Sequence, residues 1–572
     1  MKNRTLVVTS SSCLDDRIQK ADCDFLALTL PAIRFLDKSG VKYKVTEDFC
    51  DRRACQSDSV SFANDYRVWL EKKSEVIFGK DTDFLYASSA FYLLCRLSEI
   101  RYLYKLGREI DKRYDRVIFN LASPLKKWVK PEIGWSNLNL KGLGEGLDNA
   151  ISVIYRSLSI EKTIYICEGL SVINSFRLHK LLSLLFRMNE IIPRRLREFF
   201  NSFFLSSRVQ PDDEKIWVAQ DGYDVDVLIR KTRSVTFIKI RNKIEKLGIG
   251  FSQEPVKLSQ SIIDLNDNFI RKWFPSERKR LGLFLVEFYE FIISDYSVLR
   301  EKIDNMMSTD KPQGVVFSIG VEDQIDTIIA DVAIQQNVPL YVFKHSGLDN
   351  LFGVESIFDP YLDRNPDVKR TQFISCEEEK NLYSSIDKIR FVKTGSLSRP
   401  QARLRTNKKD ILYSVGPPNS NTFKDMARTV TDCERNRFVL DLINIVDAYG
   451  YGLDIKIHPS EAIISYEYFA QIRCLTKNLK ILTEGTIERI LHDYKLIVID
   501  MISTRVLTSL LHLGLPVLLM IPEDFPVSEL FINDLTSRIY VVRNDRELER
   551  FFENFHNETL THLSQEAFAQ KY

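Results

Sequence analysis

The sequence predicts an α/β protein made of two Rossmann-like domains, each built around a parallel sheet. Short apolar runs alternate with helical patterns along much of the chain, most clearly from Leu453 to Met520. Polar groups follow the apolar runs, and two of the three groups in that stretch also open a helix-like run. Strands that alternate with helices of about ten residues imply right-handed crossovers and therefore parallel strands.

Length and composition indicate a globular protein with more than one core. The chain has 572 residues, and a prior of about 150 residues per domain suggests two to four units. Hydrophobic residues make up 44% of the chain and charged residues 28%. The 80 Lys and Arg residues nearly balance the 78 Asp and Glu residues, so the overall charge does not indicate a nucleic-acid partner.

No segment of the sequence has the pattern of a signal peptide or a membrane span. The apolar run Leu6–Val8 is far shorter than a secretory apolar region. A membrane helix needs about 20 apolar residues, and the nearest candidate, residues 496–521, is interrupted by Asp500, Arg505 and His512. We therefore expect a cytoplasmic protein, and contact with the inner face of the membrane is compatible with this expectation.

The cysteines and histidines predict neither disulfides nor a structural metal. The nine cysteines include no C-x-x-C pair, and their odd number argues against a disulfide framework. The seven histidines show no ligand spacing against the cysteines. We therefore expect no metal site and no cofactor.

The elements of the first domain follow in order along the chain. Residues 1–60 have a β/α/β pattern, in which Pro31 kinks or divides the helix. Residues 175–307 are mostly helical in pattern and form a helical insertion rich in aromatic and basic residues. The expected elements of this domain are strand Thr5–Thr9, helix Ile18–Lys38, strand Tyr43–Val45, a helical stretch over 61–111, strands Arg116–Asn120, Lys162–Cys167 and Gly314–Ser318, helix Gln324–Asn337 and strand Val338–Phe343.

A polar stretch from Arg399 to Asp410 is the predicted linker, so the two domains are expected at 1–398 and 399–572. The second domain repeats short strands and short helices. Its expected elements are strand Asp410–Val415, helix Asp432–Ala448, strand Leu453–Ile457, helix Ile463–Cys474, strand Leu479–Leu482, helix Thr486–His492, strand Lys495–Ile499, helix Ser503–Leu513, strands Pro516–Met520 and Arg538–Val542, and helix Asn544–Phe555.

Three polar groups follow strands of the second domain and define the candidate binding site. The carboxyl ends of parallel strands face one crevice, so these groups are expected to converge there. Helix N-termini in such a crevice favour a phosphate-bearing ligand, such as a nucleotide sugar. The groups are His458-Pro459-Ser460, Glu484-Gly485-Thr486 and Ser503-Thr504.

The order of these motifs resembles the C-terminal half of GT-B glycosyltransferases. Gly395-Ser396 after a strand, the linker, the three groups and Gly514–Val517 follow the same sequence of motifs. More narrowly, His458-Pro459 and Ser503-Thr504 resemble the H-P and S-S/T motifs of bacterial sialyl- and Kdo-type transferases, which use cytidine monophosphate (CMP) sugars. The resemblance covers roughly residues 310–545.

The resemblance implies particular roles for these residues. His458 would donate to a phosphate or ribose oxygen, with a surface turn as the plain alternative. Ser503-Thr504 would contact phosphate, cap a helix, or do both. Glu484 would contact the ribose or the base. Asp500, at the end of its strand, is expected to support the loop that follows.

Two further groups fall at strand ends. Gly395-Ser396 would approach the donor through its backbone, or is a simple turn. His345 lies in Phe343–Gly347, which is similar to the strand-end Q-H-G of capsule and teichoic-acid transferases, with Lys344 in place of Gln and Ser346 inserted. It would lie on the N-terminal side of the cleft, or in a packed turn.

A base must take the proton of the acceptor hydroxyl if the transfer inverts configuration. The sialyltransferase-like families place a D/E-D/E-G motif in the N-terminal half, and Glu168-Gly169 matches its last two positions. Glu322-Asp323 is the competing candidate, and Asp15-Asp16 is the third. The two D-x-D matches, at 81–83 and 224–226, lie outside a strand-end context, so catalysis is expected to be independent of metal.

Together these features predict a GT-B-like glycosyltransferase of bacterial surface polysaccharide assembly, including capsule or lipopolysaccharide. The donor would be a CMP-activated Kdo or another nonulosonate, and the acceptor a glycan or a lipid-linked glycan. A basic amphipathic stretch between Arg177 and Arg197 would allow peripheral membrane contact, although a solvated helix face with its apolar side in the core is the commoner explanation of such a pattern. The alternatives are a teichoic-acid-type polyol-phosphate transferase that uses cytidine diphosphate (CDP)-glycerol, and a catalytically inactive GT-B binding module.

Overall fold

The computed structural model describes about half of the chain. The main described ranges are 4–9, 23–50, 61–73, 101–121, 163–168, 214–220, 235–246, 267–318, 324–343, 369–374, 389–393, 408–416, 432–457, 468–483, 490–500, 515–523 and 535–560, some with short gaps, and a few isolated residues lie between them.

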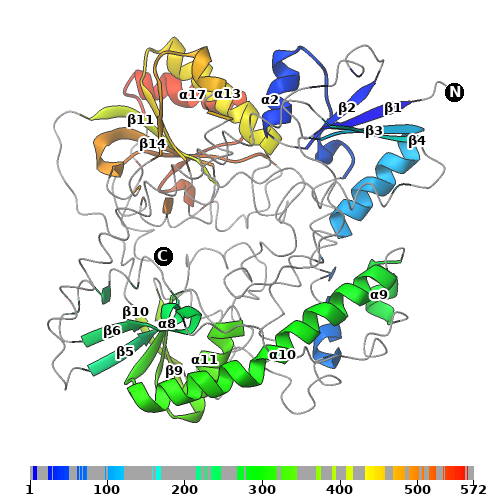
Figure 1. The fold of residues 1–572 in the computed structure, drawn as a ribbon. Helices are drawn as coiled ribbons and strands as arrows, with labels where there is room; N and C mark the ends of the chain where they lie inside the picture. The colour runs from blue at the N-terminus through cyan, green and yellow to red at the C-terminus, as the bar shows by residue number, and fades with distance from the viewer. Residues whose placement is uncertain are drawn as a thin grey trace.

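The described strands form three parallel sheets, which confirms the predicted α/β fold class with Rossmann-like units. One sheet has four strands and two have six strands, and every strand pair within them is parallel. Figure 1 shows the three sheets as separate bodies: the N-terminal sheet (blue), the middle sheet (green) and the C-terminal sheet (yellow to orange).

The N-terminal sheet has the strand order β2-β1-β3-β4. Helix α2 follows β2, and a second helical stretch over 101–113 leads into β3. The elements of this unit are β1 Thr5–Thr9, β2 Asp24–Ala27, α2 Leu30–Lys38, η1 Thr46–Asp48, β3 Arg116–Leu121 and β4 Thr163–Glu168.

The middle sheet has the strand order β10-β9-β8-β7-β5-β6. The long helix α10 packs against α11 and continues away from the sheet towards α9 (Figure 1). The elements of this unit are β5 Glu214–Val218, β6 Val235–Lys239, α8 Ile240–Lys246, α9 Asn268–Trp273, α10 Arg278–Asp310, β7 Gly314–Phe317, α11 Gln324–Gln335, β8 Leu340–Phe343, β9 Arg370–Ile374 and β10 Ile389–Lys393.

The C-terminal sheet has the strand order β13-β12-β11-β14-β15-β16. Its central strands are apolar on both faces, as expected for a parallel sheet covered by helices. The elements of this unit are β11 Lys409–Ser414, α13 Asp432–Ala448, β12 Leu453–Lys456, η9 Arg473–Leu475, β13 Leu479–Leu482, η11 Leu491–Asp493, β14 Tyr494–Ile499, β15 Val517–Met520, β16 Tyr540–Val542 and α17 Asp545–His556.

The range predicted as the first domain contains two sheets that do not pair with each other. Residues 1–398 hold both the four-stranded sheet and the middle sheet. The predicted insertion, 175–307, holds α9 and most of α10 but also β5 and β6, which join the middle sheet. All five residues of β6 are only partly buried, so this edge strand lacks the continuous apolar run by which a buried strand is recognised.

Two predicted elements near the N-terminus differ from the structure. The expected helix over 18–38 contains strand β2, and α2 begins only at Leu30. The run Asp24–Leu30 is mostly apolar, and periodicity cannot distinguish a buried strand from a helix in such a run. Pro31 lies in the first turn of α2, where its missing N–H costs nothing. The expected strand Tyr43–Val45 is reduced to one bridge, between Lys44 and Leu26.

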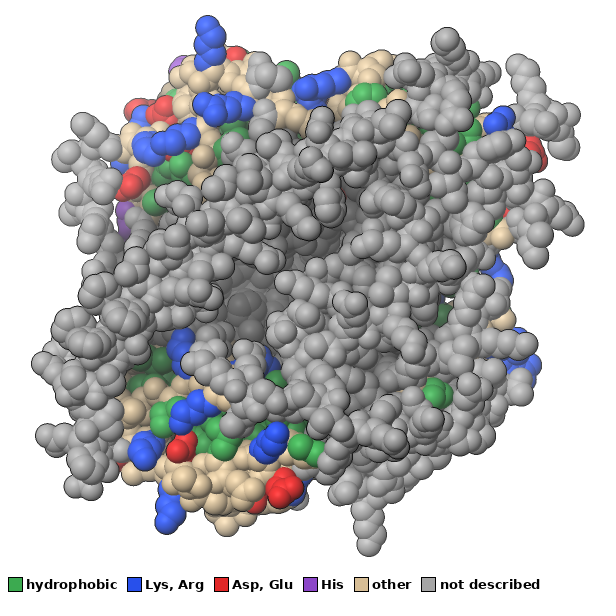
Figure 2. All heavy atoms as spheres, viewed as in Figure 1, with side chains coloured by type: hydrophobic (Ala, Val, Ile, Leu, Met, Phe, Trp, Pro, Cys, Tyr) green, Lys and Arg blue, Asp and Glu red, His purple; other side chains and the backbone are tan. Residues whose placement is uncertain are grey.

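The surface of the described residues carries charges of both signs. On the face drawn in Figure 2, Lys and Arg side chains are scattered over the units and interspersed with acidic side chains. Within the part of the chain that the structure describes, no helix is both long and apolar enough to cross a membrane.

Candidate functional site

The strand orders of the two large sheets place a topological switch point in each of them. The C-terminal order is 3-2-1-4-5-6 when its strands are numbered along the chain, which is the order of dinucleotide-binding domains. The middle order is 6-5-4-3-1-2, which extends the flavodoxin-like order. Ligands of open α/β sheets bind beside the switch point, at the carboxyl ends of the strands. In the C-terminal sheet this point lies between β11 and β14.

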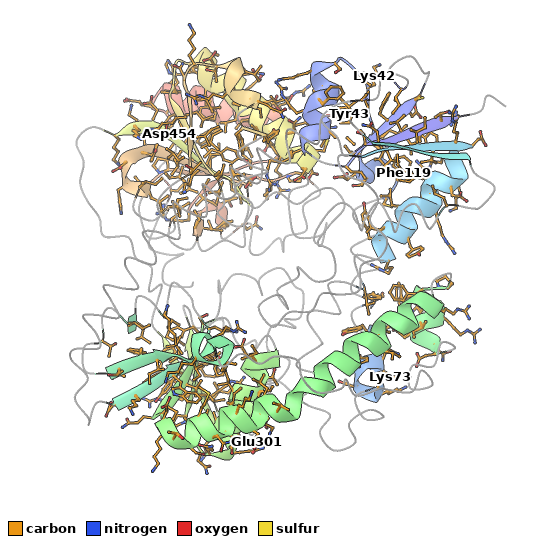
Figure 3. The ribbon with its side chains drawn as sticks, in the orientation of Figure 1. Lys42, Tyr43, Lys73, Phe119, Glu301 and Asp454 are labelled. Atoms are coloured by element: carbon orange, nitrogen blue, oxygen red, sulfur yellow. The ribbon has the colours of Figure 1, made fainter. Side chains whose placement is uncertain are left out.

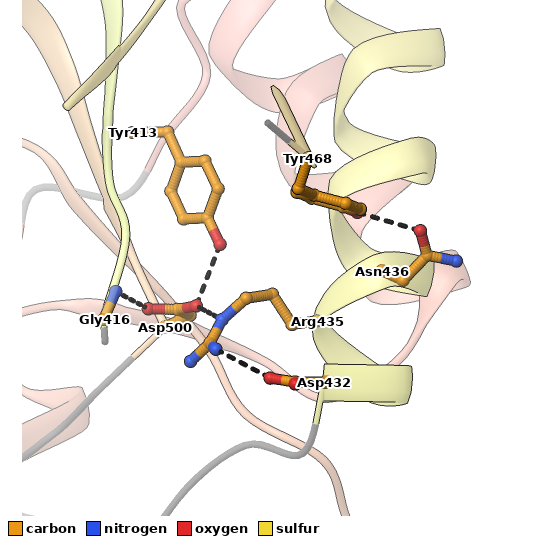
Figure 4. Close-up of polar contacts among 7 residues, drawn as sticks. All are labelled: Tyr413, Gly416, Asp432, Arg435, Asn436, Tyr468 and Asp500. Carbon is orange, nitrogen blue, oxygen red and sulfur yellow. Dashed lines mark hydrogen bonds and ion pairs between the residues drawn. The ribbon is translucent and has the colours of Figure 1, made fainter. Parts of the chain in front are cut away.

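A buried carboxylate bridges the switch point of the C-terminal sheet. Asp500 follows β14 directly and is 1% exposed. One of its oxygens accepts a hydrogen bond from the backbone N–H of Gly416, just after β11, at 2.7 Å. The other accepts from the Tyr413 hydroxyl at 2.9 Å and from Arg435 Nε at 2.5 Å. Asp500 therefore ties the ends of both strands together (Figure 4).

Arg435 brings the first turn of α13 into this network. It is 1% exposed, and its Nη1 lies 3.4 Å from Asp432 Oδ1, in the same turn. Burial lowers the pKa of Arg435, but Asp500 first, and then Tyr413 and Asp432, raise it by more, so the net shift is upward. The guanidinium therefore stays charged although it is buried.

Tyr413 stays protonated in this network. Burial, and then the charge of Asp500, raise the pKa of the Tyr413 hydroxyl well above its ordinary value. A protonated hydroxyl can keep donating to Asp500 throughout the physiological pH range. The network holds the backbone at the ends of β11 and β14 and in the first turn of α13. Its charged groups are buried and paired with one another, so they do not contact a ligand themselves.

These contacts hold the ends of β11 and β14 to α13, whereas the loop that Asp500 was predicted to support lies outside the described residues. Sequence reasoning missed the partners of Asp500. Asp432 and Arg435 occur as D-x-x-R at the start of a helix, which is a common helix-surface spacing with no functional signal of its own. Only the strand order shows that this turn lies beside the switch point.

The middle sheet carries a second polar cluster at its own switch point, between β5 and β7. Asp326, in the first turn of α11, is fully buried and accepts from Gln220 Nε2, just after β5. Ser318, just after β7, donates to Gln220 Oε1 at 3.5 Å. Arg241 of α8 lies with its Nη2 3.6 Å from Asp326 Oδ1, and its side chain is 28% exposed.

The N-terminal sheet follows the same pattern in a smaller form. Asn120, near the end of β3, donates through Nδ2 to Thr9 Oγ1, at the end of β1, at 2.9 Å. Both residues are fully buried. Each of the three sheets is therefore bridged by polar side chains between the two strands that flank its switch point.

Glu168 is the one predicted site residue that falls within the described part of the chain. It is the last residue of β4, where it lies opposite Leu121 of β3. Strand β4 is an edge strand of the four-stranded sheet, so Glu168 belongs to neither six-stranded sheet.

The other predicted site residues lie outside the described residues. The chain reaches them directly from described strands: β12 ends at Lys456, two residues before His458, and β13 ends at Leu482, two residues before Glu484. These strands are parallel neighbours, so they end at one edge of the sheet. The residues concerned are His345, Gly395, Ser396, His458, Pro459, Ser460, Glu484, Gly485, Thr486, Ser503 and Thr504, together with the acidic candidates Glu322 and Asp323.

Comparisons with known proteins find a likeness only among solved structures. No protein-family model matches the chain, and no curated protein matches its sequence. The UDP-GlcNAc 2-epimerase of Neisseria meningitidis, bound to UDP-GlcNAc, is similar over 62% of this chain and 97% of its own, at 10% identity and a TM-score of 0.35. The 2-epimerase of Methanocaldococcus jannaschii has the same coverage, with 13% identity and a TM-score of 0.37.

MurG of Acinetobacter baumannii is similar over 62% of this chain and 94% of its own, at 11% identity and a TM-score of 0.32. The fold assignment is carried by the strand orders of the sheets and not by these low-scoring likenesses.

Proposed function

We propose that this protein is a GT-B-like glycosyltransferase that binds a nucleotide sugar at the carboxyl edge of the C-terminal sheet. The observation that carries the proposal is the switch point between β11 and β14, in a sheet with the dinucleotide-binding strand order. The H-P, E-G and S-T motifs follow the strands of this same sheet in the sequence. Their resemblance to the motifs of Kdo- and sialyl-type transferases favours a CMP-activated Kdo or another nonulosonate as donor.

The middle unit, from β5 to β10, is the better candidate for the acceptor side than the four-stranded sheet. It is the other six-stranded sheet, and its switch point is bridged by the cluster around Asp326. In the sequence, the acidic pair Glu322-Asp323 falls between β7 and α11, shortly before Asp326. We therefore favour Glu322 or Asp323 as the base over Glu168, which ends an edge strand of the smaller sheet.

The proposed reaction is a direct displacement in which the acceptor oxygen forms a bond to the anomeric carbon of the donor. The bond from that carbon to the CMP phosphate oxygen breaks, and CMP leaves with the electron pair. The acceptor hydroxyl loses its proton to the base. Helix N-termini and hydroxyl groups at the carboxyl edge would stabilise the leaving phosphate. The acceptor would be a glycan or a lipid-linked glycan of a surface polysaccharide.

Calorimetric titration with CMP, CDP, uridine monophosphate and uridine diphosphate tests the nucleotide site. We expect cytidine nucleotides to bind best, and His458→Ala to weaken that binding by about 10- to 100-fold, since one charge-assisted hydrogen bond contributes about 1.5–3 kcal/mol. His492→Ala is the matched control, because His492 lies in η11, before β14 and so at the opposite edge of the sheet. Equal affinity of His458→Ala and the unmodified protein would remove His458 from the site.

Product analysis separates the proposed activity from its alternatives. Transfer from CMP-Kdo supports the glycosyltransferase, and transfer from CDP-glycerol supports the teichoic-acid-type alternative. Nucleotide binding without donor hydrolysis or transfer, unchanged by Glu322→Gln, Asp323→Asn and Glu168→Ala, would support the inactive binding module.

A further inference from the structure

The N-terminal unit packs against the C-terminal unit and also contacts the helices of the middle unit. Helix α2 of this unit lies against α13 of the C-terminal unit (Figure 1). The helical stretch over 101–113 leads from the core of the N-terminal sheet towards α9 and α10 (Figure 1). The two contacts involve different residues, so each can be examined separately.

At the first contact, the two units share their apolar cores. Leu30 of α2 is 2% exposed and belongs to the core cluster of the C-terminal sheet. Cys433 of α13 is 2% exposed and belongs to the core cluster of the N-terminal sheet. This exchange of side chains excludes water from the contact, as in the interior of a single domain.

Polar groups fix the register of the same contact. Asn436 of α13 donates through Nδ2 to Asp37 of α2 at 3.0 Å. The Asn436 side-chain oxygen accepts from the Tyr468 hydroxyl at 2.8 Å (Figure 4). Tyr43, which Figure 3 labels beside this contact, has its pKa raised by burial, then by Cys433 and Asp37. Asn436 directly follows Arg435, so this contact and the candidate site share one turn of α13.

The second contact is made by Arg101, whose guanidinium lies over the rings of Phe62 and Trp273, in an aromatic cluster that belongs to the core of the middle unit. Trp69 stacks on Phe269 with ring centroids 5.0 Å apart, and Phe62 meets Trp273 edge-on at 5.3 Å. The guanidinium of Arg101 lies 4.9 Å from the ring centre of Trp273. Arg101 opens the helical stretch whose residues Leu103, Leu106 and Ile110 belong to the core of the N-terminal sheet.

Ion pairs and hydrogen bonds surround this cluster. Asp65 accepts from Trp273 Nε1 at 2.8 Å and from Lys272 at 2.7 Å. Lys73, labelled beside α10 in Figure 3, lies 3.5 Å from Asp267. From here α10 runs to the middle sheet, where Leu299 and Ile303 join the same core cluster as Val315 of β7.

We propose that the N-terminal unit is a brace that fixes the position of the C-terminal unit relative to the middle unit. One chain segment, residues 394–408, connects the last strand of the middle sheet to the first strand of the C-terminal sheet. The brace adds a second connection, which passes from α13 through α2 and the N-terminal core to the aromatic cluster and α10. Units held at two places cannot reorient by a simple hinge about one linker.

The brace is tested by measuring distances between the two larger units with each contact intact or broken. Spin labels carried on noncanonical amino acids at Glu301 of α10 and Arg550 of α17 leave the native cysteines in place, and both positions are exposed. Pulsed electron resonance then reports the distribution of distances. We expect one narrow distribution for the otherwise unmodified protein.

Asn436→Asp combined with Trp273→Ala weakens both contacts, because it opposes Asp37 at the first and removes one of the two rings beside Arg101 at the second. The aspartate at 436 has nearly the shape of asparagine but faces the carboxylate of Asp37, and like charges repel at this distance. We expect the distance distribution to broaden and shift. Asp37→Asn combined with Asn436→Asp, with Trp273 retained, places an amide donor at position 37 opposite a carboxylate acceptor at position 436. This variant should return the narrow distribution. Arg271→Ala, at an exposed neighbour of the aromatic cluster, is the control for Trp273→Ala.

The proposal is overturned if the Asn436→Asp/Trp273→Ala protein is folded and keeps the narrow distribution of the unmodified protein. If that variant does not fold, hydrogen exchange of the unmodified protein decides. If the brace is present, the amides of α2 and of the first turns of α13 exchange at the same rate, and as slowly as those of β11. Faster and independent exchange of the α2 amides contradicts the proposal. Neither measurement depends on which nucleotide binds, so the result is independent of the proposed function.

Discussion

At the scale of single residues, the Arg435–Asp500 pair is the contact on which the candidate site depends most. Both side chains are almost completely removed from water. Taking two charges out of water is costly, and their attraction offsets that cost only while both partners remain. The other polar partners of Asp500, Gly416 and Tyr413, complete its hydrogen bonding. Removing one member therefore leaves a buried charge without its counterion.

Arg435→Met is expected to lower the stability of the C-terminal unit by about 3–5 kcal/mol, because the Asp500 carboxylate stays buried. The opening free energy of β14 amides, measured by hydrogen exchange, reports this loss. Lys495→Met removes an exposed ion pair with Asp410 and should cost about 1 kcal/mol or less. Arg437→Met, at an exposed position two residues along α13, is the matched control. Equal losses for Arg435→Met and Lys495→Met would contradict the role given to the buried pair.

At the scale of elements, four helices end in the same way. In each, the second residue after the helix has a positive φ, and the N–H of the following residue bonds to the carbonyl five residues earlier, which is the Schellman motif. Helices α2 and α13 have Gly40 and Gly450 at this position, with φ of 64° and 71°. Helices α11 and α17 have Asn337 and Glu558, with φ of 57° and 56°. The bonds in question include Tyr451 N–H to Val446 C=O, at 2.9 Å, and Thr559 N–H to Asn554 C=O, also at 2.9 Å.

Substitutions at these helix ends should change stability in opposite directions. Glu558→Gly is expected to stabilise α17 by about 1 kcal/mol, because a residue with a Cβ is strained in the left-handed region. Gly450→Ala should destabilise α13 by a similar amount for the same reason. Gly452→Ala is the control, since a Cβ there would meet only Asp410 Oδ2, at 3.7 Å. Urea unfolding midpoints measure all three changes, and a loss of stability in Glu558→Gly would refute the argument.

The same helix ends show why some elements were predictable from the sequence. The predicted helix Asp432–Ala448 and strand Leu479–Leu482 match the structure to the residue. Helix α13 combines an acidic first turn with a glycine shortly after its last residue, and both are local signals. Strand β9, Arg370–Ile374, was not predicted. It contains buried Arg370 and Gln372, so it lacks an apolar pattern and forms through its pairing with β8 and β10.

At the scale of the whole molecule, the sequence predicted the class of fold but not the number of sheets. Alternating strands and helices are visible locally, whereas the sheet that a strand joins depends on contacts between distant segments. Strand β5 pairs with β7 nearly one hundred residues later in the chain. The candidate site shows the same limit. Asp500 was recognised at a strand end, but Arg435 and Gly416 become its partners only through the order of the strands.

The two switch points make the assignment of donor and acceptor sides testable in the intact protein. Because a bound ligand stabilises the state to which it binds, CMP should slow hydrogen exchange of backbone amides close to its site. We expect slower exchange at Gly416, in the first turn of α13 and at the ends of β12 and β14. The amides of Gln220 and Ser318, at the switch point of the middle sheet, should be unaffected. Arg435→Met should reduce the protection by CMP, whereas Arg437→Met should not. Protection by CMP confined to the middle sheet would reverse the assignment, with the donor on the middle unit and the acceptor on the C-terminal unit.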